Sequence, residues 1–200
     1  MRRVAALLPL IATSAVAVSC GVAFVGHAPA AEPTAAPERV AGMVDPADPS
    51  RLQTPYTSDE IRDGWVEGLE IVMRRWTPEG AVRERWTVVE ADDAGCVTRI
   101  ERLGPDGLPA GEPVSGRSSW DELRRHASFP AERAQRRWED RETALGALEG
   151  WFYSVEDPDA GTVTEFFFAD RYPGAPAWMR MRTGDDVVIE LEQVQRGRAD

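Results

Sequence analysis

From Leu69 onward, apolar and polar residues tend to alternate with a period of two, in short runs that end at turn sequences. Leu69, Ile71 and Met73 occupy alternate positions, and the Pro-Glu-Gly sequence at 78–80 ends this run. Side chains on a β-strand point alternately to its two faces, so this period is typical of strands with one buried face. Runs of this kind, separated by turn residues, predict antiparallel hairpins.

The same pattern recurs along most of the remaining chain. We expect further strands over residues 82–89, 97–103, 134–143, 147–155, 162–169, 177–182 and 186–195. About eight or nine strands exceed a comfortable flat sheet, and such sheets curl or close. The sequence therefore predicts a mainly β (α+β) fold, with a curved antiparallel meander sheet or half-barrel and two short helices.

Two capping-box sequences mark the expected helices. Thr57 is followed by Glu60, and Ser119 is followed by Glu122, each at the spacing that closes a helix N-terminus. Pro130 ends the second helix. Two short helices cover only part of one sheet face, so either side chains fill the rest or a cavity remains.

The first 25 residues have the features of an export signal, a positive head followed by an apolar run. Residues 17–20, Ala-Val-Ser-Cys, resemble a bacterial lipobox, which would attach a lipid to Cys20. The Ala-Pro-Ala sequence at 28–30 offers ordinary cleavage after Ala30 instead, and an uncleaved anchor is the third outcome. The intact mass of the mature protein would decide among them.

Each outcome places the rest of the chain outside the cytoplasm, either lipid-anchored in the bacterial cell envelope or periplasmic or secreted. Residues 26–55 are rich in Ala and Pro and are expected to form a linker. Residues 56–200 are expected to form a single antiparallel β domain.

Two stretches, LGALEGWFYSV at 145–155 and TEFFFADRYPGAPAWMRM at 164–181, resemble a pattern in bacterial envelope proteins with an unclosed β-barrel. These proteins include the carriers that move lipoproteins to the outer membrane. In the pattern, two aromatic strands are followed by a Pro-Gly bend, which lets a strand turn sharply at a barrel corner. The resemblance implies a half-barrel that can hold an acyl chain, and it implies no site residues.

Composition excludes several classes of partner and chemistry. The formal net charge of -11 repels phosphate backbones, so nucleic acid is not expected as a partner. The sequence contains no phosphate-binding glycine loop, nucleophile elbow or zinc-protease motif, and we predict neither a cofactor nor a metal site. His126 is the only histidine beyond the linker, and it is the one weak candidate for catalysis, with Glu122 one turn earlier.

Aromatic residues are the remaining candidates for binding. We expect Trp86, Trp151, Phe166, Phe168 and Trp178 to line the sheet, where they either pack a core or hold an apolar ligand. Arginines beside tryptophans, as at 137–138, also permit cross-strand cation–π contacts.

Three hypotheses follow. The first is a non-catalytic module that holds a lipid or another apolar ligand. The second is an envelope protein that binds or assembles another protein through a sheet edge or an aromatic patch. The third is a hydrolase that uses His126.

Overall fold

The computed structural model describes residues 44–198. The predicted export segment 1–25 and the processing sites at Cys20 and after Ala30 lie outside the described residues. So does the greater part of the predicted linker, up to residue 43.

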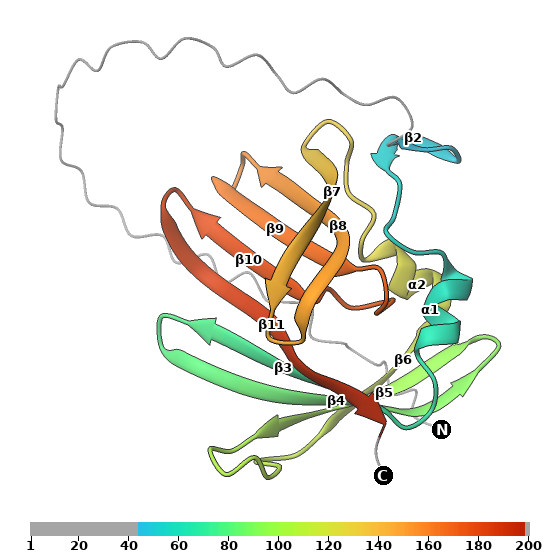
Figure 1. Cartoon of the computed structure of the whole chain (residues 1–200), viewed down its shortest axis with the longest axis vertical. Coiled ribbons are helices and arrows are strands. Elements are labelled where there is room, and N and C mark those ends of the chain that lie inside the picture. Colours follow the sequence, from blue (N-terminus) through green and yellow to red (C-terminus); the bar gives the residue numbers. More distant parts are fainter. Residues whose placement is uncertain (1–43, 199–200) are drawn as a thin grey trace, which may run out of the picture. The chain divides into compact units, whose positions relative to one another are not determined.

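The domain is built on one strongly curved antiparallel sheet of nine strands (Figure 1). Its order is β6-β5-β4-β3-β11-β10-β9-β8-β7, and it is not closed into a barrel, which confirms the predicted fold class. The strands are β3 (Leu69–Thr77), β4 (Gly80–Asp92), β5 (Gly95–Leu103), β6 (Val114–Ser119), β7 (Ala134–Thr143), β8 (Gly146–Asp157), β9 (Thr162–Ala169), β10 (Trp178–Thr183) and β11 (Asp186–Arg198).

The strand order differs from a simple meander in one respect. A meander would place its first and last strands at the two edges, but here β3 and β11 pair with each other near the middle of the sheet. The chain leaves β6 at one edge, passes through a helix and resumes with β7 at the other edge. Turn sequences predict which neighbours in sequence pair, but they carry no information on this long-range pairing.

Residues 44–55, predicted as the end of the linker, contain regular structure. They contain the short strands β1 (Val44–Asp45) and β2 (Asp48–Leu52), which pair with each other. The Leu52 N–H donates to the Phe129 carbonyl oxygen at 2.9 Å, and the Leu52 side chain is buried. This apolar anchor attaches the end of the predicted linker to the domain.

Both predicted capping boxes are present. Thr57 and Glu60 close the N-terminus of α1 (Ser58–Gly64), and Ser119 and Glu122 close that of α2 (Trp120–Arg125). In each case the hydroxyl accepts from the backbone N–H of the glutamate, and the glutamate carboxylate accepts from the cap backbone. The two helices contact each other and bury Ile61 and Trp120 against the sheet.

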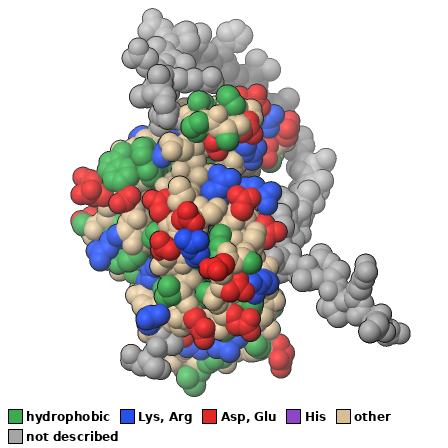
Figure 2. All heavy atoms as spheres, turned by 90° about the vertical axis from the view of Figure 1, so that its right-hand side faces the viewer, with side chains coloured by type: hydrophobic (Ala, Val, Ile, Leu, Met, Phe, Trp, Pro, Cys, Tyr) green, Lys and Arg blue, Asp and Glu red, His purple; other side chains and the backbone are tan. Residues whose placement is uncertain are grey.

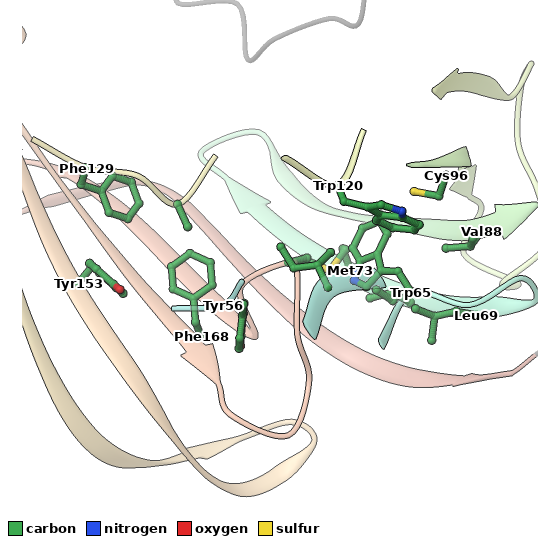
Figure 3. Packing of buried hydrophobic residues seen from close by; sticks show 14 of the residues in the cluster. Tyr56, Trp65, Leu69, Met73, Val88, Cys96, Trp120, Phe129, Tyr153 and Phe168 are labelled. Atoms are coloured by element: carbon green, nitrogen blue, oxygen red, sulfur yellow. The ribbon is translucent and has the colours of Figure 1, made fainter. Parts of the chain in front are cut away.

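The main core lies on the inner side of the curved sheet, between the sheet and the helices (Figure 3). We call the sheet face that carries Ile71, Met73, Tyr153 and Phe168 the inner face. Its core also contains Trp65 and other residues from both helices and from the segments before and after them. A second, smaller cluster occupies the opposite, outer face, and its buried members are Leu148, Phe152, Phe167, Ala169, Ala177 and Trp178.

Candidate functional site

The five aromatic candidates do not share one face of the sheet. Trp151 lies directly opposite Phe168 and shares its face, and Trp86 lies opposite Ile71, so these residues belong to the inner face. Trp178 lies opposite Phe167 and belongs to the outer face. The Phe-Phe-Phe run at 166–168 therefore supplies both faces, because neighbours on a strand point in opposite directions.

On the inner face the candidates pack against the rest of the domain. Phe166 stacks on Phe129 with ring centroids 4.9 Å apart and on Phe168 at 6.0 Å. Phe168 is only 3% exposed, whereas Trp86 and Trp151 are half-buried. Ligand binding by these five residues stays a prediction, and their described role is packing.

Trp178 lies in the outer cluster, where arginines cover the aromatic rings. The Arg141 guanidinium lies 4.0 Å from the Trp178 ring centroid, and that of Arg137 lies 3.7 Å from the Phe152 centroid. Glu139 pairs with both arginines, at 2.7 Å to Arg137 and 2.9 Å to Arg141. The guanidinium groups thus form cation–π contacts with the rings while Glu139 pairs with their charges.

The outer cluster requires β7 and β8 to bend over it. Arg141 of β7 reaches Trp178 of β10 although two strands separate them in the sheet. The Ala144 N–H in the β7–β8 turn donates to Glu192 Oε1 of β11 at 2.8 Å. Gly150 lies within this bend, and a Cβ atom there would overlap the Phe168 carbonyl oxygen. Glycine thus permits the close approach of β8 to β9.

The helices cover only one end of the inner face. The chain enters α2 beside the β4–β5 turn, and the Trp120 indole N–H donates to the Asp92 carbonyl oxygen of that turn at 2.9 Å. The β3–β4 and β10–β11 turns lie at the other side, away from both helices (Figure 1). Along this uncovered end the inner face carries partly exposed apolar residues, which we call the open strip: Val82, Ile100, Val114, Met181, Ile189 and Leu191.

An ion pair lies within the open strip. Arg75 lies directly opposite Val82 and Leu191 on the neighbouring strands, and its Nη2 contacts Glu84 Oε1 at 3.3 Å. The Arg75 side chain is 41% exposed and that of Glu84 is 24% exposed. The strip therefore combines aliphatic side chains with a central pair of opposite charges. On the side of the molecule that Figure 2 shows, which is the right-hand side of Figure 1, acidic and basic side chains are also interspersed.

Among residues 44–198, the contacts of His126 are those of a residue at a helix C-terminus, and none of them indicates catalysis. His126 is exposed at the C-terminus of α2, and its backbone N–H donates to the Glu122 and Leu123 carbonyl oxygens. The Glu122 carboxylate accepts from the Ser119 backbone and hydroxyl, and these hydrogen bonds lower its pKa. Within residues 44–198, no group of three or more His, Cys, Asp or Glu side chains is placed to hold a metal ion.

Cys96 is fully buried in the main core, where burial raises the pKa of its thiol. It fills space beside α2 as a small apolar side chain. No helix within the described part of the chain is long and apolar enough to cross a membrane.

Two buried tyrosines hold the segment around residue 54 and the β9–β10 loop against the core. The Tyr56 hydroxyl donates to the Ala169 carbonyl oxygen at 2.6 Å, and the Tyr153 hydroxyl donates to that of Gln53 at 2.7 Å. Burial raises the pKa of both hydroxyls, since the phenolate would lose its solvation. Nearby Arg196 is half-buried, and its partial removal from water lowers its pKa to about 10.

We expect Tyr56 and Tyr153 to ionise only when the domain unfolds. Because folding raises their pKa, their contribution to stability is complete below the unfolded value of ~10 and is lost as the pH rises above it. Alkaline titration followed by tyrosinate absorbance should show two of the three tyrosines ionising together with the loss of near-ultraviolet circular dichroism. Gradual ionisation of all three in the folded protein would contradict the burial.

Comparison with known proteins identifies no family. No protein-family model and no curated protein matches the chain. Among solved structures, Pseudomonas aeruginosa MucB in complex with MucA matches with 11% identity and a TM-score of 0.49, over 71% of this chain and 56% of that chain. A second MucB structure, in complex with MucA(peri), matches with 12% identity and a TM-score of 0.49, over 70% of this chain and 55% of that chain.

A candidate lipoprotein from Parabacteroides distasonis matches with 7% identity and a TM-score of 0.42, over 66% of this chain and 96% of that chain. This chain thus spans little more than half the length of the matched MucB chains. At these identities and TM-scores, the similarity assigns no function to it.

Proposed function

We propose that this chain is a non-catalytic binding module of the bacterial cell envelope, and that its open strip holds the apolar side of a partner polypeptide. The observation that carries the proposal is the open strip itself, a set of partly exposed apolar residues at the end of the inner face that the helices do not cover. The envelope location rests on the export features of residues 1–25, with Cys20 as the site of a lipid anchor if the lipobox is used.

The ion pair within the strip favours a polypeptide over a bare hydrocarbon chain. A hydrocarbon laid over Arg75 and Glu84 would remove water from both charges and offer no hydrogen bonds in return. A polypeptide can place apolar side chains on Ile189 and Leu191 and polar groups on the ion pair. Met181 lies on the same face and is partly exposed, and its flexible side chain can adapt to varied apolar surfaces.

An apolar ligand such as a lipid is the second candidate. The inner face continues from the open strip to Trp86 and Phe166, which are half-buried and aromatic. A crosslinking experiment distinguishes a polypeptide from a lipid, because the mass of the crosslinked adduct shows which of them was bound.

Site-specific photocrosslinking in the source cell tests the proposal. A photoreactive residue placed at Met181 or Ile189 should yield a protein adduct. The same residue at Val163 should not, because Val163 lies opposite Arg182 on the outer face and is similarly half-buried. Ile189→Asp should abolish the adduct formed from Met181 while the circular dichroism of the domain is retained.

The outcomes are distinct. An adduct that carries only lipid mass supports the second candidate and overturns the first. An absence of adducts from Met181 and Ile189, or equal adducts from Val163, overturns both.

A further inference from the structure

Strand β7 is an edge strand with an exposed tryptophan. It pairs only with β8, so one side of its backbone has no neighbouring strand within the described sheet. Trp138, at its centre, is 45% exposed and packs edge-on against Trp151 with ring centroids 5.0 Å apart. An unpaired strand edge can form backbone hydrogen bonds with a strand of another chain, and exposed aromatic rings often mark protein–protein interfaces.

The residues whose backbone groups face the open side can be identified. The Arg133 carbonyl oxygen accepts from the Glu156 N–H at 2.8 Å, so odd-numbered residues of this segment point their backbone groups toward β8. Backbone direction alternates along an antiparallel strand. Even-numbered residues, including Arg136, Trp138 and Asp140, therefore present their N–H and C=O groups to the open edge.

Charges on the inner face of β7 lack partners among the described residues. Arg136 stacks 3.4 Å from the Trp151 ring centroid and donates to Gln53 Oε1, but within residues 44–198 it pairs with no carboxylate. Burial lowers its pKa. Asp140 lies directly opposite Glu149, both are exposed, and neither forms an ion pair with a described residue. Like charges placed opposite each other on a sheet destabilise the pair.

We propose that two copies of this chain associate through β7, antiparallel, with Trp138 on the twofold axis. In that register Arg136 of each copy lies opposite Asp140 of the other, and Arg137 lies opposite Glu139. Each of these charged side chains thus lies opposite a side chain of opposite charge in the other copy. Arg136 and Asp140, which form no ion pair among the described residues of the monomer, both gain one in the dimer.

The backbone agrees with the same register. Trp138 lies opposite Trp138 of the other copy, and Arg136 lies opposite Asp140 of the other copy. The backbone N–H and C=O groups of all three residues face the interface, so each of these facing pairs can exchange two backbone hydrogen bonds. Facing residues of paired strands share a face. The two Trp138 rings would therefore continue the row begun by each Trp151 on the inner face. A twofold axis closes the association at two copies and leaves no open β7 edge.

Charge reversal at Asp140 distinguishes an effect on dimerisation from an effect on the stability of the monomer. Asp140→Arg places two arginines opposite each other at both symmetric positions of the dimer and should raise the dimer dissociation constant about tenfold or more. In the monomer the same change puts an arginine opposite Glu149, so the thermal midpoint of the dilute protein should stay the same or rise. Sedimentation equilibrium over a concentration series measures the association.

A mixing experiment tests the register. Arg136→Glu alone should also weaken self-association, because the introduced carboxylate would face Asp140 of the other copy. A mixture of the Asp140→Arg and Arg136→Glu proteins should associate one to one, because every facing pair then has opposite charges.

Two further variants keep the result decisive if Arg136→Glu folds poorly. Asp140→Pro removes an N–H that faces the open edge and should abolish the dimer without loss of the β7–β8 ladder. Glu90→Arg makes the same change in net charge as Asp140→Arg, but at an exposed site within the sheet, and should leave the dimer intact. A wild-type protein that stays monomeric throughout the series, or a dimer unaffected by Asp140→Pro, overturns the proposal.

Discussion

Replacement of Trp178 by alanine is expected to lower the free energy of unfolding by about 4 kcal/mol, the range for a large buried aromatic residue. Trp178 is 6% exposed, contacts the other members of the outer cluster and donates from its indole to Glu190 Oε1 at 3.3 Å. Its loss leaves a cavity beneath Arg141, which then covers no ring. Urea unfolding monitored by circular dichroism measures the change.

Leu108→Ala is the matched control for this prediction. Leu108 is apolar but 64% exposed, so its truncation should change the free energy of unfolding by less than ~0.5 kcal/mol. If Trp178 lined a ligand site and did not fill a core, its replacement would cost little stability. A loss below ~1 kcal/mol would therefore refute the packing role.

Gly150→Ala is expected to cost about 3 kcal/mol, because overpacking forces the backbone to move. The added Cβ would overlap the Phe168 carbonyl oxygen and lie 2.9 Å from the Ala169 Cα, and neither backbone atom can swing aside as a side-chain end can. The strain would separate β8 from β9 where the β7–β8 hairpin bends over the outer cluster. The same urea titration measures it.

Gly197→Ala provides the comparison within the same sheet. Gly197 lies in β11, and no heavy atom lies within 4 Å of the position that its Cβ would take. We expect a change smaller than ~0.5 kcal/mol. Equal effects at the two glycines would show that the close approach at Gly150 is relieved without cost.

Local sequence signals predicted most strands and both helix starts. The expected strands at 134–143 and 162–169 match β7 and β9, and both capping boxes form, since these features depend on neighbouring residues. Strand β6 was missed because Val-Ser-Gly-Arg-Ser-Ser carries a single apolar side chain and so shows no alternation. It pairs with β5 through backbone groups that every residue supplies.

The candidate site was harder to predict because it depends on which strands become neighbours. Sequence spacing selected Trp178 together with Phe166, yet the register between β9 and β10 places the two on opposite faces. The open strip joins Ile100 of β5 to Ile189 of β11 only because β11 returns to pair with β3. The contact between Arg141 and Trp178 likewise joins strands that two other strands separate in the sheet, and no local pattern predicts it.

The central position of β11 has a consequence for how the domain acquires its structure. The ribbon β3–β6 and the ribbon β7–β10 can each form from hairpins, but within the described sheet only β11 joins them. Long-range pairing of this kind is slow, because the intervening chain must first lose its freedom. Before β11 pairs with β3 and β10, the sheet therefore consists of two separate halves. Formation of the complete nine-stranded sheet thus depends on β11.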